Sequence, residues 1–222
     1  MIADDSLWVG ALTGEWMSGL KIFRIVIWGM VALLAAWLFI LGNRIAPPEG
    51  QSINVMEPST PAIGKPFELV SHTGRVVNNY TLRGKPYLVF FGFTHCPDIC
   101  PTTLFELTDL MKELGPVADE FNVAFISVDP ERDTKDLLSG YMTSFDPRII
   151  ALRGDLDQTE TAVKAFAAYF RKVPTEGGNY TMDHTAGVYL MDAKGGFKGT
   201  LDMHESREIR LQKIRNLLAT SS

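Results

Sequence analysis

Cysteine is scarce in this sequence of 222 residues, which contains only Cys96 and Cys100. Two cysteines are too few for a scaffold held by several disulfides. Two cysteines also disfavour a structural zinc site, because such a site usually takes four protein ligands. The spacing C-x-x-x-C excludes a C-x-x-C redox pair. A single structural disulfide remains one interpretation, and a site that uses both thiols is the other.

Blocks of basic residues are also lacking. Lysine and arginine number 21 against 26 acidic residues, for a net charge of −5. Residues 1–44 contribute no net charge, so the remainder of the chain carries all of it. An acidic domain without a basic patch is a poor candidate for binding nucleic acid. Internal repeats and low-complexity tracts are absent from the sequence as well.

Charge is missing from residues 25–42, which read IVIWGMVALLAAWLFILG. Eighteen apolar residues, at about 1.5 Å each, nearly cross a hydrocarbon core of roughly 30 Å. Lys21 and Arg24 precede the run, and Trp28 and Trp37 lie near its ends, as is typical of a membrane span. A buried core helix is disfavoured because the run is apolar on every face. We therefore predict a transmembrane helix at 25–42.

An A-x-A cleavage site is absent after this run, which favours an uncleaved anchor over a signal peptide. Two basic residues precede the run and Arg44 follows it, so residues 1–24 are expected in the cytoplasm. The acidic residues of this segment do not fit a mitochondrial presequence. The predicted location is a bacterial cytoplasmic membrane, with the C-terminal domain in the periplasm.

A proline-rich segment, 43–61, is predicted to be a semi-stiff linker. Residues 62–222 then form one domain in which strands and helices alternate. This order predicts an α/β fold of the thioredoxin-like type, a mixed central sheet flanked by helices. The expected strands are 67–70, 76–77, 87–93, 123–128, 149–152, 186–191 and 197–203, and the expected helices are 101–114, 134–145, 155–170 and 206–218.

The two cysteines fall where a buried strand ends and a helix begins. Backbone N–H groups and the positive helix end favour thiolates there, so we expect both thiols to be acidic. The spacing places the sulfurs about one helical turn apart, where they can face one ion or form a disulfide. A structural disulfide is disfavoured because a domain of this size does not need one.

Four histidines are candidates for a further ligand. His72 and His204 are expected in solvated loops, and His95 is expected to point away from the sulfurs. His184 follows a glycine-rich loop and precedes a predicted strand, where a thioredoxin-like sheet passes close to the cysteine loop. Asp183 beside it is a candidate for orienting the imidazole. The residues alone leave the role of His184 open.

Three separated segments resemble the SCO/SenC family of copper chaperones for cytochrome oxidase assembly. They are FGFTHCPDICP at 91–101, SVDPERDT at 127–134 and YTMDHTAGVYLMDAKGGF at 180–197. The resemblance implies that Cys96, Cys100 and His184 bind one copper ion per chain. Two thiolates and one imidazole form a soft set that suits Cu(I) and accepts Cu(II) with an added ligand.

The resemblance also implies that Asp183 and Asp98 lie near the metal. Two positions depart from the usual pattern of the family without affecting a ligand, since Thr185 replaces a serine and Ala193 a proline. The nine methionines are scattered, and most of them, such as Met111, Met142 and Met191, are expected to pack in the core rather than to bind copper.

The expected function is that of a metallochaperone rather than an enzyme. Its implied partners are cytochrome c oxidase subunit II, at the binuclear copper A centre, and other copper carriers. The alternative is a thiol–disulfide oxidoreductase in which Cys96 and Cys100 form a redox-active disulfide and reduce the cysteines of the client. A thiol peroxidase is disfavoured because no arginine lies near Cys96 in the sequence.

Overall fold

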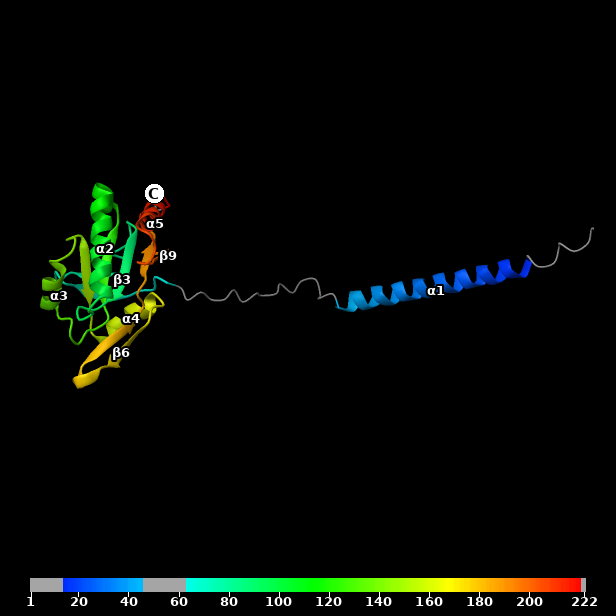
Figure 1. Ribbon diagram of the computed structural model, residues 1–222, viewed down its shortest axis with the longest axis horizontal. Helices are drawn as coiled ribbons and strands as arrows, with labels where there is room; N and C mark the ends of the chain where they lie inside the picture. The colour runs from blue at the N-terminus through cyan, green and yellow to red at the C-terminus, as the bar shows by residue number, and fades with distance from the viewer. Residues whose placement is uncertain (1–13, 46–62, 221–222) are drawn as a thin grey trace, which may run out of the picture. The chain divides into compact units, whose positions relative to one another are not determined.

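The computed structural model describes residues 14–45 and 63–220, with side chains for 21–41 and 63–220 (Figure 1). The chain divides into two units, Met1–Glu57 and Pro58–Ser222, each of which is described by itself. Most of the predicted linker, 46–61, lies outside the described residues.

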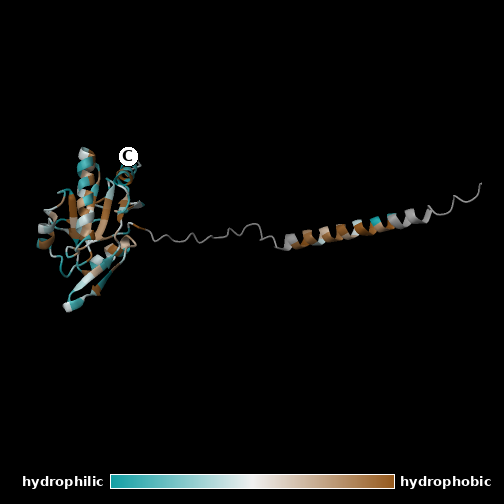
Figure 2. Ribbon diagram, viewed as in Figure 1, coloured by the Kyte–Doolittle hydropathy of each residue, from teal (hydrophilic) through white to brown (hydrophobic). Residues whose placement is uncertain are grey.

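The first unit contains one long helix, α1 (Gly14–Ile45). Its segment Lys21–Leu41 has a mean hydropathy of 2.2 and none of it is buried, which makes it a candidate membrane span (Figure 2). The uncharged run predicted from the sequence is therefore part of a longer helix, which begins at Gly14 and continues into the segment expected as linker. At about 1.5 Å per residue α1 is about 48 Å long, more than a hydrocarbon core of roughly 30 Å.

The second unit is built on a mixed sheet of seven strands in the order β2-β1-β5-β4-β3-β8-β9. The central strands β3, β4 and β5 are parallel. Strands β1 and β8 pair with this central group antiparallel, and the edge strands β2 and β9 pair antiparallel with β1 and β8. Every residue of β3 is buried, as its continuous apolar run predicts. The strands are β1 (Glu68–Ser71), β2 (Val76–Asn78), β3 (Tyr87–Gly92), β4 (Asn122–Ser127), β5 (Ile149–Arg153), β8 (Val188–Met191) and β9 (Phe197–Leu201).

Helices flank this sheet and confirm the thioredoxin-like arrangement. Asp155 and Gln158 form the capping box that the sequence predicts, and Ser206 caps the last helix by accepting from the Ile209 N–H. Met111, Met142 and Met191 are buried in the core, as expected. The helices are α2 (Ile99–Leu114), η1 (Gly115–Glu120), α3 (Lys135–Met142), α4 (Leu156–Ala165), η2 (Glu176–Gly178) and α5 (Arg207–Ala219).

The helix predicted over 155–170 agrees with the structure through Ala165, and the prediction is wrong for the last five residues. Helix α4 ends at Ala165, and Ala167 adopts a left-handed φ of 50°, which no regular helix allows. Phe170 instead begins β6 (Phe170–Pro174), which pairs antiparallel with β7 (Tyr180–His184) in a separate two-stranded sheet. His184 is therefore the last residue of a strand rather than part of a loop.

Candidate metal centre

The two cysteines lie on either side of the start of α2. Strand β3 ends at Gly92, a loop carries Cys96, and Cys100 is the second residue of α2. Pro101 is tolerated there because the N–H groups of the first helical turn have no partner within the helix. Both thiols are free; that of Cys96 is partly exposed and that of Cys100 is buried.

Gly92 makes room for the buried thiol. A Cβ added to Gly92 would lie 2.8 Å from Cys100 Sγ and 2.7 Å from Phe125 Cε2, closer than packed atoms allow. The absence of a side chain at the end of β3 therefore lets the Cys100 sulfur lie directly over the strand.

The thiols of Cys96 and Cys100 have opposite pKa shifts. The pKa of Cys96 is lowered to about 5, chiefly because the Cys100 thiol donates a hydrogen bond to it. The backbone N–H of Cys100, 3.4 Å from Cys96 Sγ, stabilises the thiolate further. The pKa of Cys100 is raised because it is the donor of that bond and because it is buried. The prediction that both thiols are acidic is therefore right for Cys96 and wrong for Cys100.

His184 reaches the cysteines from β7. Its Nε2 lies 3.6 Å from Cys100 Sγ, and its Nδ1 lies 3.1 Å from the carbonyl oxygen of Thr185. Because a carbonyl only accepts, Nδ1 carries the proton and the lone pair of Nε2 faces the sulfur. The rings of Phe90 and Phe93 meet the imidazole edge-on, at centroid distances of 6.3 and 5.9 Å. The structure thus places His184, whose role the residues alone leave open, beside the buried thiol.

The two aspartates expected near the metal have other partners in the described structure. The exposed carboxylate of Asp183 forms an ion pair of 2.8 Å with Arg171, so the Thr185 carbonyl rather than Asp183 orients the imidazole. The side chain of Asp98 accepts a hydrogen bond from Thr102 Oγ1 at 3.2 Å. The backbone of Asp98 contributes to the low pKa of the Cys96 thiol.

The other three histidines stay away from the sulfurs, as expected, although one of them is not a solvated loop residue. His95 Nδ1 lies 3.0 Å from Thr94 Oγ1. His204 is almost fully exposed. His72 is partly buried, and its Nδ1 accepts the backbone N–H of Ala151 at 3.1 Å.

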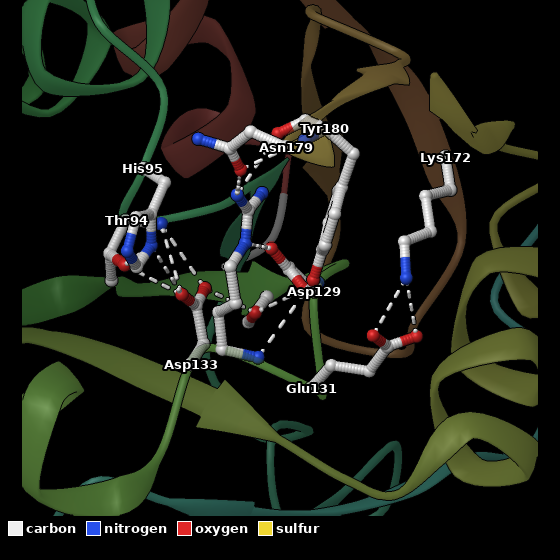
Figure 3. Close-up of polar contacts among 10 residues, drawn as sticks. Thr94, His95, Asp129, Glu131, Asp133, Lys172, Asn179 and Tyr180 are labelled. Carbon is white, nitrogen blue, oxygen red and sulfur yellow. Dashed lines mark hydrogen bonds and ion pairs between the residues drawn. The ribbon is translucent and has the colours of Figure 1, made fainter. Parts of the chain in front are cut away.

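A buried carboxylate that sequence reasoning missed supports the cysteine loop. Asp133 accepts hydrogen bonds from Thr94 Oγ1 and Ser127 Oγ, both at 2.6 Å, and from the Thr94 N–H at 3.1 Å (Figure 3). Burial raises its pKa, and these hydrogen bonds oppose that rise. Asp133 therefore fastens the residue two positions before Cys96 to the end of β4. The signal was present in the segment SVDPERDT, where an acidic residue recurs beside a buried strand.

The distances fit a shared metal ion between Cys100 and His184. Ligands held at about 2.3 Å for sulfur and about 2.0–2.1 Å for nitrogen, as on zinc, lie roughly 3.5–3.8 Å apart at tetrahedral to trigonal angles. The observed separation of 3.6 Å agrees. Within the described residues no group of three or more histidine, cysteine or acidic side chains is already gathered tightly enough to hold an ion. An ion shared by Cys96, Cys100 and His184 would therefore require these side chains to move closer together.

Comparisons with known proteins identify relatives of this chain. The family model described as SCO1/SenC matches residues 55–219. An SCO2-like protein of Rickettsia prowazekii is 34% identical over 181 residues, which cover 80% of this chain and 88% of that protein.

Solved structures show the same fold. ScoI of Bradyrhizobium japonicum with copper bound is 44% identical, with a TM-score of 0.67 over 71% of this chain and all of that one. Yeast Sco1 with copper bound is 32% identical, with a TM-score of 0.67 over 72% of this chain and 91% of that one. The family model spans most of the sequence and includes both cysteines and His184, so the chain belongs to the SCO1/SenC family.

Proposed function

We propose that this protein is a membrane-anchored copper chaperone that binds one copper ion through Cys96, Cys100 and His184. The observation that carries the proposal is the approach of His184 Nε2 to the buried Cys100 thiol, next to the more acidic Cys96. Thiolate and imidazole donors select copper or zinc over magnesium or calcium. Similar proteins of bacterial and yeast origin have been solved with copper bound.

The proposed client is the binuclear copper A centre of cytochrome c oxidase subunit II, loaded with copper that other carriers supply. The family is linked to cytochrome c oxidase assembly. The partial exposure of Cys96 supports transfer, because an incoming ligand can reach the ion from that side.

Deleting the gene should reduce the copper A content of the oxidase, measured by optical and electron paramagnetic resonance spectra of purified membranes. Wild-type protein should restore the signal, and a His184→Ala protein expressed at the same level should not. A normal copper A signal in the deletion strain, at limiting copper, would exclude subunit II as the client.

A second candidate function is reduction of disulfides in the client. The thiolate of Cys96 can attack a client disulfide to form a mixed disulfide, and Cys100 can then lose its proton and displace the client as a dithiol. Cys96 and Cys100 end as a disulfide, which an external thiol reductant must reduce before the next cycle. The opposite pKa shifts of Cys96 and Cys100 favour this order of attack.

We also propose that α1 spans a bacterial cytoplasmic membrane, with its N-terminus in the cytoplasm and residues 62–222 in the periplasm. The basic residues Lys21 and Arg24 before the uncharged run 25–42 support this orientation. An alkaline phosphatase fused after Ser222 should be active, because that enzyme matures only outside the cytoplasm, and green fluorescent protein at the same position should stay dark. The reverse pattern would overturn the orientation.

A further inference from the structure

The face that β7 turns toward the domain carries three residues with three different partners. In a strand, side chains at alternate positions share a face, so Tyr180, Met182 and His184 lie together. Met182 is buried in the core, and His184 meets the Cys100 thiol. Tyr180 lies at the opposite end of the strand, about 13 Å from His184 at roughly 3.3 Å per residue.

Tyr180 is held by residues that follow β4. Its hydroxyl donates to Asp129 Oδ1 at 2.9 Å (Figure 3). Arg132 Nε donates to the other carboxylate oxygen at 2.5 Å, and Arg132 Nη1 donates to the Tyr180 carbonyl at 3.0 Å. The guanidinium also lies 3.7 Å from the centroid of the Tyr180 ring. We call Asp129, Arg132 and Tyr180 the Arg132 clamp.

The clamp is largely shielded from water and connects both ends of β7. The side chain of Arg132 is 18% exposed and that of Asp129 only 2%. The guanidinium lies 5.8 Å from the centroid of the Phe93 ring, which in turn meets the imidazole of His184. Charge-assisted hydrogen bonds in such a setting contribute more than those at an exposed surface.

The hairpin needs an anchor of this kind. Strands β6 and β7 form a sheet of their own, and a two-stranded hairpin is marginally stable in water. The exposed pair Lys172–Glu131, at 2.7 Å, joins the hairpin to the same loop but contributes little by itself. The hairpin therefore keeps its place through contacts such as the clamp.

We propose that Arg132 is a positioning residue for His184: through Asp129 and Tyr180 it holds the β6–β7 hairpin where the imidazole reaches Cys100. The inference rests on the proposed function for its effect on copper, but its effect on the hairpin is independent of any metal. An arginine is required because its planar fork contacts the carboxylate and the backbone carbonyl together, which a lysine does not.

The test compares variants of the full chain in detergent by hydrogen exchange without metal and by competitive copper binding. Arg132→Gln should speed amide exchange in residues 170–184 at least about tenfold, with β3 unchanged. It should lower copper affinity about 10–100-fold, as is usual for a residue that supports a ligand. Arg132→Lys should give an amide exchange rate and a copper affinity between those of Arg132→Gln and wild type.

Two variants serve as matched controls. Arg171→Gln removes the exposed ion pair with Asp183 on the same hairpin and should change affinity less than twofold. Arg148→Gln breaks the ion pairs with Asp146 and Asp119, so it reports general destabilisation without a change in the hairpin. A third variant, Tyr180→Phe, keeps the ring but loses the hydrogen bond to Asp129, so it should also loosen the hairpin. It takes the place of Arg132→Gln in the test if that variant fails to fold.

Unchanged hairpin exchange in Arg132→Gln, or in Tyr180→Phe if the first does not fold, would overturn the inference. A looser hairpin with unchanged affinity would also overturn it, provided that His184→Ala loses copper. If His184→Ala itself keeps full affinity, the proposed ligand set fails instead. In that case the exchange data still decide whether Arg132 fixes the hairpin.

Discussion

His184→Ala should lower the copper affinity of the reduced chain by about 3 kcal/mol or more, roughly a hundredfold. Wild-type protein should bind one copper ion per chain, because the site offers two sulfurs and one imidazole nitrogen with no spare donor. The measurement is a competition titration with a Cu(I) chelator under reducing conditions. Cys96→Ala and Cys100→Ala should weaken binding by at least as much.

The other histidines provide matched controls for this experiment. His95→Ala removes an imidazole one residue from Cys96 that faces Thr94, and His204→Ala removes an almost fully exposed one. Both variants should bind copper like wild type. One-to-one binding that survives undiminished in His184→Ala would remove His184 from the site.

The same variant separates the two candidate functions. Disulfide exchange uses the thiols of Cys96 and Cys100, so His184→Ala should still reduce a model peptide disulfide.

The number of protons released when wild-type protein binds copper shows how many of the thiols are protonated in the metal-free site. Since the pKa of Cys96 is about 5 and that of Cys100 is raised, uptake at pH 7 should release close to one proton, from Cys100. Calorimetry in buffers of different ionisation enthalpy measures this number.

Oxidation of Cys96 and Cys100 to a disulfide should abolish tight copper binding. A metal binds the thiolate, and a disulfide sulfur is a poor ligand, so His184 alone would remain. Chains oxidised with a mild disulfide reagent should elute without copper from a desalting column, and reduction should restore one ion per chain. An oxidised chain that holds copper as tightly as the reduced chain would show the proposed ligands to be wrong.

Local patterns predicted most of the central sheet. The continuous apolar runs of β3 and β4 and the cap at Asp155 are determined by nearby residues, so a sequence indicates them directly. The β6–β7 hairpin was missed because no residue of β6 is buried and its apolar residues form neither a continuous nor an alternating run, so its place depends on contacts with distant residues. The left-handed turn at Ala167 gives no signal, since alanine usually favours a helix.

The candidate site shows the same division between local and distant effects. The cysteines and His184 were recognised from short motifs, and the structure brings His184 to Cys100. The raised pKa of Cys100 was not predictable, because it follows from burial and from the hydrogen bond that its thiol donates. The supporting role of Asp133 depends on its contact with Thr94, 39 residues earlier in the sequence.

The two edges of the seven-stranded sheet bear on how neighbouring copies behave. A membrane tether concentrates copies in two dimensions, and open sheet edges then invite strand exchange and aggregation. Here one edge, β2, is only three residues long. The other edge, β9, is interrupted where Lys198 forms an extra residue opposite Leu190 and Met191. Short, irregular or charged edges resist pairing, so both edges disfavour edge-to-edge assembly of the copies that a membrane span, as proposed for α1, would bring together.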